Sequence, residues 1–210
     1  MRLFPMLCVV VALAPFLAGP AMAETAEPSF TVVSKDGDFE VRRYDPMIVA
    51  HVTVPGDRGE AANRGFRVLA DYIFGANRPG EKIAMTAPVI QEPTARDGQK
   101  IAMTAPVLQE PAGADTWTVT FVMPAEFTME TLPAPKSETI TIEQVPGDTM
   151  AVVRFSGFNT KARLDEETQR LRAFMADKGL AVEGTPRFAF YNPPWTLPFL
   201  RRNEVMIPTN

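Results

Sequence analysis

The chain has 210 residues, a formal net charge of −4, one histidine and one cysteine. Its lysines and arginines are scattered along a mildly acidic sequence. Binding to nucleic acid or to an anionic membrane surface is therefore not expected, because both require clustered positive charge. The cysteine, Cys8, lies in an apolar N-terminal stretch, so the rest of the chain excludes disulfides, thiolate catalysis and cysteine-based metal sites.

The N-terminal segment has the three parts of a secretory signal peptide. Arg2 is followed by an apolar stretch over residues 3–17 and by the small-residue ending Ala21-Met22-Ala23. This order predicts a signal peptide over residues 1–23 and an exported, periplasmic or secreted domain over residues 24–210, with a net charge of −5 after Arg2 is lost. The apolar stretch contains two prolines and is shorter than the ~20 residues that span a bilayer, so no stable membrane anchor is expected.

Short alternating segments separated by proline or glycine predict strands with one buried face. They are Phe39–Tyr44, Met47–Val54, Trp117–Met123, Glu138–Val145, Met150–Ser156, Arg187–Tyr191 and Glu204–Ile207. Their lengths and spacing favour antiparallel pairing.

An amphipathic helix is predicted over residues 58–74. Its apolar positions recur at helical spacing, while charged residues occupy the other side. Asp57 with Glu60 forms a capping-box-like start, and Gly75 marks the end. The apolar positions are Ala62, Phe66, Leu69, Ala70 and Ile73.

A twelve-residue segment occurs twice, as Lys82–Pro93 and as Lys100–Pro111, and differs only at Ile90 and Leu108. We interpret the copies as two adjacent strands joined by a turn over residues 93–98. Met85 and Met103 occupy equivalent positions in the two copies. Their thioethers are soft metal ligands, but core packing is the expected role because no close Met-x-x-Met pair accompanies them.

A second helix is predicted near residues 160–178. Leu164, Thr168, Leu171 and Met175 follow helical spacing, Asn159 or Thr160 can cap the start, and Gly179 ends it.

The two halves of the chain repeat the same order of elements. Phe39–Val89 and Ile140–Pro194 each read as strand, strand, helix, strand. The expected fold is therefore α+β, with duplicated β-β-α-β units forming a twisted antiparallel half-barrel and two helices on one side. A cleft between a helix and a sheet edge would suit a flat apolar ligand.

His51 is the sole histidine and alternates with Met47, Val49 and Thr53 on its strand. A neutral imidazole can ligate haem iron, but a hydrogen-bonded structural role is also open. The sequence contains no Gly-x-Ser-x-Gly elbow, phosphate-binding loop or metal-ligand cluster. A binding protein is therefore expected rather than an enzyme, and an effector-sensing or protein-interaction domain is the alternative.

Five segments in order resemble the SOUL/haem-binding protein family, across residues ~30–208. They are Phe39–Tyr44, Tyr72–Gly75, Lys82–Val89, Phe121–Pro124, and Tyr191–Pro194 followed by Arg201–Val205. The resemblance implies the half-barrel fold also seen in bacterial effector-binding domains. It also implies haem or another porphyrin as the ligand, making a small-molecule tetrapyrrole the expected partner; no protein partner is indicated.

The same resemblance places a haem groove on one face of the first helix, at Asn63, Phe66 and Ala70. The family's propionate-binding basic residue maps to Asn63, so Arg64 or Arg67 would supply the positive charge. Arg43 stands where some members have a proposed axial histidine.

Overall fold

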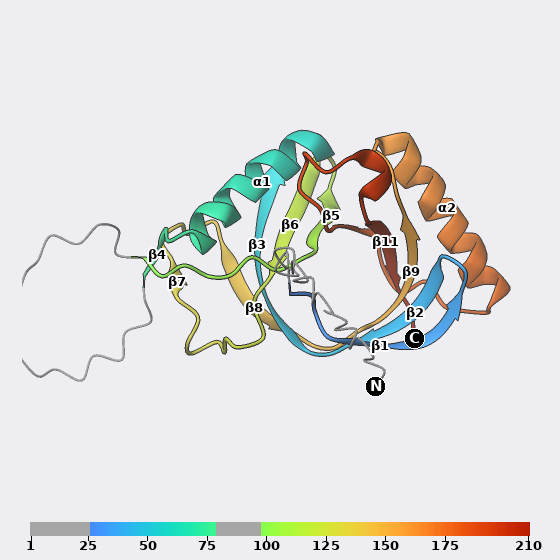
Figure 1. Ribbon diagram of the computed structural model, residues 1–210, viewed down its shortest axis with the longest axis horizontal. Coiled ribbons are helices and arrows are strands. Elements are labelled where there is room, and N and C mark those ends of the chain that lie inside the picture. The colour runs from blue at the N-terminus through green and yellow to red at the C-terminus, as the bar shows by residue number, and fades with distance from the viewer. Residues whose placement is uncertain (1–25, 79–97) are drawn as a thin grey trace, which may run out of the picture.

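The computed structural model describes residues 26–78 and 98–210, whose main feature is a curved antiparallel sheet (Figure 1). Nine strands hydrogen bond in the order β1-β2-β9-β11-β10-β5-β6-β3-β8. They are β1 Phe30–Asp36, β2 Phe39–Tyr44, β3 Met47–Pro55, β5 Val107–Gly113, β6 Thr116–Val122, β8 Thr141–Val145, β9 Thr149–Phe155, β10 Arg187–Phe190 and β11 Asn203–Pro208. A small second sheet pairs β4 Asn77–Arg78 with β7 Ala134–Pro135. The helices are α1 Arg58–Ile73, α2 Lys161–Asp177 and the short 3-10 helix η1 Pro198–Leu200.

The strand pairing has the symmetry of a duplicated unit. The first unit contributes β2, β3, α1, β5 and β6, and the second contributes β8, β9, α2, β10 and β11. The two units pair with each other at three places. β2 of the first unit pairs with β9 of the second, β3 of the first pairs with β8 of the second, and β5 pairs with β10 in the middle of the sheet. The predicted half-barrel of duplicated units is confirmed, although each unit carries a fourth strand. The third strand predicted to end at Ala87-Pro88 lies outside the described residues.

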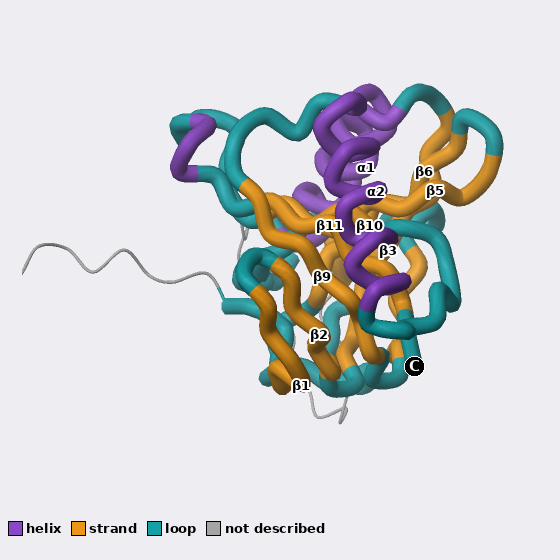
Figure 2. The backbone as a smooth tube through the Cα atoms, turned by 90° about the vertical axis from the view of Figure 1, so that its right-hand side faces the viewer, coloured by secondary structure: helices purple, strands orange, loops and turns teal. Residues whose placement is uncertain are grey.

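Both helices cover the convex face of the sheet, α1 over β3 and β6 and α2 over β9 and β11 (Figures 1 and 2). The alternation of each strand decides which side chains meet a helix. On β3, Ala50, Val52 and Val54 pack beneath α1. On β9, Ala151 and Val153 pack in the core beneath α2. The intervening residues of the same strands face the concave side.

Both long helices begin and end where the sequence predicts. The Asp57 carboxylate accepts a hydrogen bond from the Glu60 amide at 3.0 Å, and the Thr160 hydroxyl accepts one from the Arg163 amide at 3.3 Å. Gly75 and Gly179 follow the helices with φ of 115° and 68°, a region that glycine adopts without steric cost. Within the described residues, neither helix is long and apolar enough to cross a membrane.

The prediction for the repeated segment is wrong in its second copy. Residues 100–106 form no strand, and β5 begins only at Val107, after a cis Ala105–Pro106 bond. β5 pairs with β6 on one edge and, over residues 107–109, with β10 on the other. Met103 is partly exposed instead of packed in the core. The first copy, including Met85, lies outside the described residues.

One further strand prediction needs correction, and one strand was not predicted. β8 starts at Thr141 instead of Glu138, because Ser137, Thr139 and Ile140 form a hydrogen-bonded turn before it. No strand was predicted at β1, because this edge strand has mostly exposed side chains and therefore no clear alternating pattern.

Candidate functional site

A cavity of about 440 Å³ opens on the concave face of the sheet. This volume lies within the roughly 300–1,000 Å³ typical of small-molecule sites. Its walls come from eight strands and are largely apolar. The apolar lining residues are Pro28, Met47, Val49, Pro106, Leu108, Val122, Val145, Pro146, Met150 and Met206. A second hollow, of about 730 Å³, adjoins it beside the loop over residues 123–130.

The polar lining of the concave cavity is mainly acidic. Glu110, Glu143 and Asp148 contribute carboxylates, and Arg187 contributes a guanidinium. Arg187 is already paired, because its Nε lies 2.9 Å from Glu110 Oε2 and its Nη1 lies 3.8 Å from Asp148 Oδ2. The cavity therefore has more negative than positive charge and no unpaired cation among its lining residues.

His51 faces this cavity, on the side of β3 opposite the residues that pack beneath α1. Its Nδ1 lies 3.3 Å from Glu143 Oε1 on the paired strand β8, and its side chain is about one quarter exposed. The alternation predicted from the sequence is confirmed. A carboxylate neighbour can fix the tautomer of the ring, which leaves Nε2 as the nitrogen available to a ligand.

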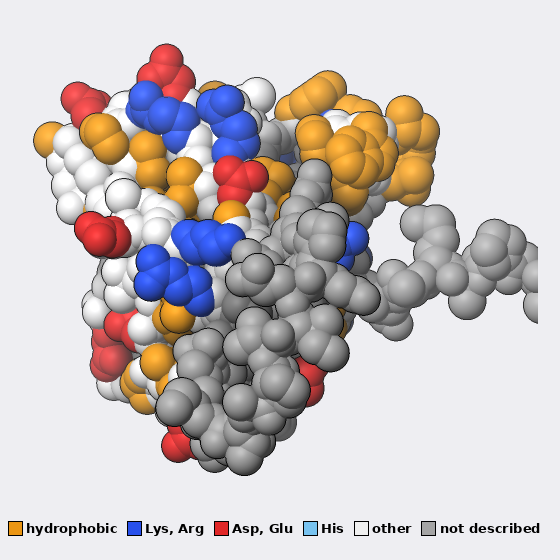
Figure 3. All heavy atoms as spheres, turned by 90° about the vertical axis from the view of Figure 1, so that its left-hand side faces the viewer, with side chains coloured by type: hydrophobic (Ala, Val, Ile, Leu, Met, Phe, Trp, Pro, Cys, Tyr) orange, Lys and Arg blue, Asp and Glu red, His pale blue; other side chains and the backbone are white. Residues whose placement is uncertain are grey.

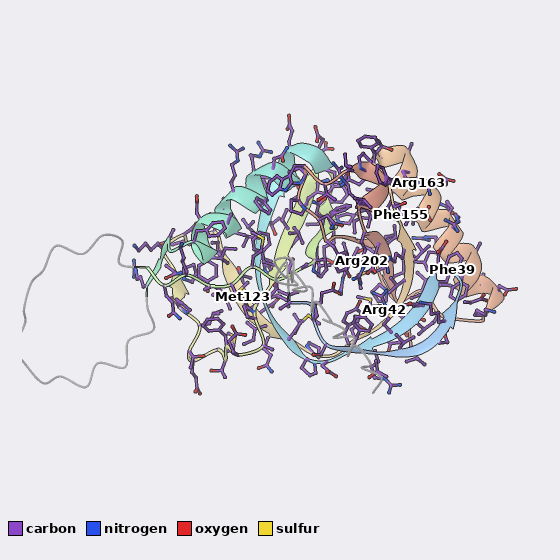
Figure 4. All side chains as sticks on the ribbon, viewed as in Figure 1. Phe39, Arg42, Met123, Phe155, Arg163 and Arg202 are labelled. Carbon is purple, nitrogen blue, oxygen red and sulfur yellow. The ribbon has the colours of Figure 1, made fainter. Side chains whose placement is uncertain are left out.

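Next to the cavity, Glu204 joins strands β2 and β11 and the segment after β10 through a buried polar cluster. Its oxygens accept two hydrogen bonds from Arg42 at 2.9 and 3.0 Å, one from Arg202 Nε at 3.0 Å and one from the Tyr191 hydroxyl at 2.6 Å. Arg42 also donates to the hydroxyl of Tyr44, which lines the cavity. Figure 4 shows Arg42 and Arg202 inside the curl of the sheet, whereas Phe39, Phe155 and Arg163 lie on the α2 side.

Burial sets the protonation of this cluster. It raises the pKa of Tyr44 to about 12 and, together with the Glu204 carboxylate, moves the pKa of Tyr191 far above its usual value. Burial alone would lower the pKa of Arg42, but the bidentate pair with Glu204 outweighs it and raises that pKa. Both tyrosines are therefore neutral at physiological pH: Tyr191 donates to Glu204, and Tyr44 accepts from Arg42. A buried network satisfied in this way makes this side of the cavity rigid.

None of the five residues predicted on the first helix lines the concave cavity. Phe66 is 38% exposed, and its ring meets Phe121 of β6 edge-on at a centroid distance of 5.4 Å. Ala70 lies one turn further on and is largely buried. Asn63, Arg64 and Arg67 are exposed.

Both arginines form hydrogen bonds to backbone atoms close to the helix. Arg64 donates to the carbonyl of Pro55, and Arg67 donates to the carbonyl of Asn63 at 3.2 Å. Because these contacts are solvent-exposed, they are weak enough to be exchanged for a ligand carboxylate.

Gly65 lies against the sheet on this helix. A Cβ at Gly65 would lie 2.6 Å from Cγ2 of Val119. The missing side chain therefore lets α1 approach β6 closely instead of opening a groove at that point. Any ligand beside α1 must lie on the outer surface next to Phe66.

The structure thus separates the sequence-predicted residues into two places. Asn63, Arg64, Phe66, Arg67 and Ala70 lie together on α1, while His51 lies in the concave cavity. The other inner-face residues of the cavity were missed as candidates, although their positions, alternating with the core residues, carried the signal. Among the described residues, no group of three histidine, cysteine or acidic side chains is placed to hold a metal ion.

Comparison with known proteins gives a consistent result. The model of the family described as SOUL heme-binding protein matches residues 25–208. Heme-binding protein 2 of Homo sapiens is 28% identical over 175 residues, covering 81% of this chain and 78% of the human protein. Its counterpart from Mus musculus is 27% identical over 177 residues, covering 81% of this chain and 78% of the mouse protein.

Solved structures with the same fold are more distant in sequence. The EcmrR C-terminal domain superposes with a TM-score of 0.57 at 13% identity, covering 82% of this chain and 96% of that domain. A hydrolase from Listeria innocua gives a TM-score of 0.55 at 12% identity, covering 85% of this chain and 94% of the other. At such identities the likeness establishes the fold alone, which is of the effector-binding-domain type.

Proposed function

Because the chain belongs to the SOUL heme-binding protein family, we propose that it binds haem or a related tetrapyrrole without catalysing a reaction on it. The residue inventory supports a binding role, since residues 24–210 contain one histidine and no cysteine. Binding in general follows from the family. The charges and exposed apolar groups of α1 and of the concave cavity distinguish these two candidate positions for the ligand.

We place the tetrapyrrole on the outer side of α1, beside Phe66 and Ala70. The observation that carries this choice is a partly exposed aromatic ring, 38% accessible and held edge-on by Phe121, next to two exposed arginines. A macrocycle can stack on Phe66, and Arg64 or Arg67 can pair with its propionates. Apolar contact then supplies most of the affinity, because an exposed ion pair contributes only about 0–1 kcal/mol.

The concave cavity is less suited to an anionic ligand. Its three carboxylates outnumber one paired guanidinium, so haem propionates entering it would meet repulsion. Its apolar walls and acidic charge instead favour a flat amphipathic ligand that is neutral or cationic. This is the second candidate function, effector sensing, and its specific support is the charge of the lining.

Haemin titration with detection of the Soret shift tests the proposal. Metal-free protoporphyrin should compete with haemin at comparable concentration, because iron has no protein ligand in the α1 site. Ala70→Glu, which places a negative charge in the contact, should weaken both ligands at least about tenfold. Ala173→Glu, the same change at an exposed position of α2, is the matched control and should leave binding unchanged.

Three further results decide the location. Arg67→Glu alters only an exposed side chain, so it should weaken binding even if Ala70→Glu perturbs folding. His51→Ala should have no effect on haemin. Loss of haemin binding in His51→Ala with retention in Ala70→Glu and Arg67→Glu would move the site to the concave cavity. Absence of any Soret shift in the wild-type protein would reject tetrapyrrole binding altogether.

A further inference from the structure

The segment between β10 and β11 carries an unusual concentration of exposed apolar side chains. Trp195 is 82% exposed and Phe199 is 69% exposed, while Leu197, Leu200 and the neighbouring Phe158 are each more than half exposed. In Figure 2 the short helix η1 projects at the upper left, away from both long helices, and the same corner appears at the upper right of Figure 3 as a group of apolar side chains. We call these five residues the apolar tip.

The backbone beneath the apolar tip is held in place. Arg201 Nε donates to the carbonyl of Thr196 at 2.8 Å, and its guanidinium also bonds the carbonyl of Pro194 and lies 5.6 Å from the ring centre of Phe158. The Gly157 amide donates to the carbonyl of Pro198 at 2.9 Å, which joins the β9–α2 loop to η1. Since the loop is already ordered, its side chains can be buried in another phase with little further loss of backbone entropy.

The apolar tip is larger than an ordinary apolar surface patch, and its shape argues against a protein interface. With about 150–250 Å² for each whole aromatic side chain, the exposed fractions amount to roughly 650 Å². This exceeds the roughly 300–600 Å² of the largest apolar patch on a typical monomer. The tip also projects from the body of the molecule instead of presenting a broad face (Figure 2).

The composition of the apolar tip suits a lipid surface. Tryptophan is enriched at the membrane interface, where its ring lies among the headgroups, and leucine and phenylalanine insert into the adjoining acyl region. The nearest guanidinium, Arg201, is engaged with backbone carbonyls, and the whole protein is acidic. Contact should therefore depend on apolar burial and need no anionic lipid.

We propose that the apolar tip inserts reversibly into the interface of a lipid bilayer and so holds the domain at a membrane surface. This contact is independent of the tetrapyrrole site, because none of its residues belongs to α1. It is a surface association, in keeping with the absence, among the described helices, of one that could span a membrane.

Tryptophan fluorescence provides a local test, because the chain contains only Trp117 and Trp195. The full chain is expressed as Trp117→Phe, which leaves Trp195 as the reporter, and is mixed with vesicles of phosphatidylcholine. We expect a blue shift and quenching by brominated acyl chains. If Trp117→Phe disturbs the core, the difference between wild type and Trp195→Phe isolates the same signal.

Variants decide whether the apolar tip drives the association. Leu197→Ser with Phe199→Ser alters exposed side chains and should weaken vesicle binding at least about tenfold. Val33→Ser, at an equally exposed apolar residue of β1, is the matched control and should bind like the parent. High salt should leave binding unchanged.

Three outcomes would overturn the proposal. The first is an absence of any blue shift or quenching with vesicles. The second is equal binding by the Leu197→Ser/Phe199→Ser variant, which would show that another segment makes the contact. The third is concentration-dependent self-association that the same variant abolishes while vesicles have no effect, which would identify the apolar tip as an interface with a second copy. Haemin titration of the Leu197→Ser/Phe199→Ser variant is carried out without vesicles, so it tests tetrapyrrole binding separately from membrane binding.

Discussion

Replacing Glu204 by glutamine should destabilise the protein strongly, because this carboxylate is the centre of a fully buried cluster. It accepts four hydrogen bonds, two from Arg42, one from Arg202 and one from Tyr191. Glutamine keeps the shape but removes the negative charge. Its amide NH₂ group would also face N–H groups of the two guanidinium groups, so donor would meet donor. Arg42, whose side chain is 3% exposed, would keep its ion pair with Glu40 at 2.7 Å and its hydrogen bond to the Tyr44 hydroxyl, but it would no longer face a carboxylate at position 204.

Breaking one partner of a buried ion pair costs about 3–5 kcal/mol. The remaining contact to Glu40 places the expected loss near the lower end, at about 3 kcal/mol. For a domain of this size each 1 kcal/mol lowers the thermal midpoint by roughly 2–4 °C, so the midpoint should fall by about 6–12 °C. Thermal unfolding followed by circular dichroism measures the change.

The matched control is Glu166→Gln, which removes the same charge from an exposed pair with Arg163 on α2. Exposed pairs contribute about 0–1 kcal/mol, so its midpoint should barely move. A double variant, Arg42→Leu with Glu204→Leu, should be less destabilised than Glu204→Gln, because it leaves no unpaired buried charge between these two positions. If Glu204→Gln melted within about 2 °C of the control, the cluster would not stabilise the fold as argued.

Three further predictions concern the helix packing, the alkaline stability and the N-terminus. Gly65→Ala should lower the free energy of unfolding by about 1–3 kcal/mol despite a better helix propensity, because its Cβ would lie 2.6 Å from Val119. The control Gly59→Ala, whose Cβ would make only one contact at 3.4 Å, should be neutral or stabilising, and equal urea midpoints for the two variants would contradict the packing argument. Burial raises the pKa of Tyr72 from 10.0 to about 12, so the stability that its neutral hydroxyl contributes is complete below pH 10 and is lost as pH rises to about 12. In urea unfolding, Tyr72→Phe should lose less free energy of unfolding over this pH window than the wild type, and an equal pH dependence of the two proteins would refute the prediction. N-terminal sequencing of the mature protein should place its first residue near Glu24, and recovery of an uncleaved, membrane-embedded form would contradict the predicted signal peptide.

The local features of the fold were predictable from the sequence. The bounds of α1 and α2, their caps at Asp57 and Thr160 and the strand β3 follow from periodicity and from capping chemistry, both of which act within a few residues. The alternation along β3 placed His51 opposite the helix-facing residues, and the structure confirms this placement. The repeated order of elements predicted the duplicated half-barrel for the same reason, since each unit is built from local patterns.

The residues that decide the candidate site depended on long-range contacts. Glu167 and Glu204 are fully buried, although an isolated acidic residue is normally assigned to the surface. Arg163 and Arg170 accompany Glu167 from nearby turns of α2, but Arg42 reaches Glu204 from the far end of the chain. Composition and residue spacing cannot identify an ion-pair partner that lies 162 residues away in the chain.

The pairing of β5 was equally beyond local reasoning. The near-identical copies around residues 82–93 and 100–111 suggested neighbours, yet β5 lies between β6 of its own unit and β10 of the other unit, in the middle of the sheet. The curved sheet encloses the concave cavity, and Arg201 of the 192–202 segment lies against the ring of Phe158. Sequence periodicity determined which face of each strand is apolar, whereas tertiary packing decided which faces were brought together, because strand partners are chosen by contacts far apart in the chain.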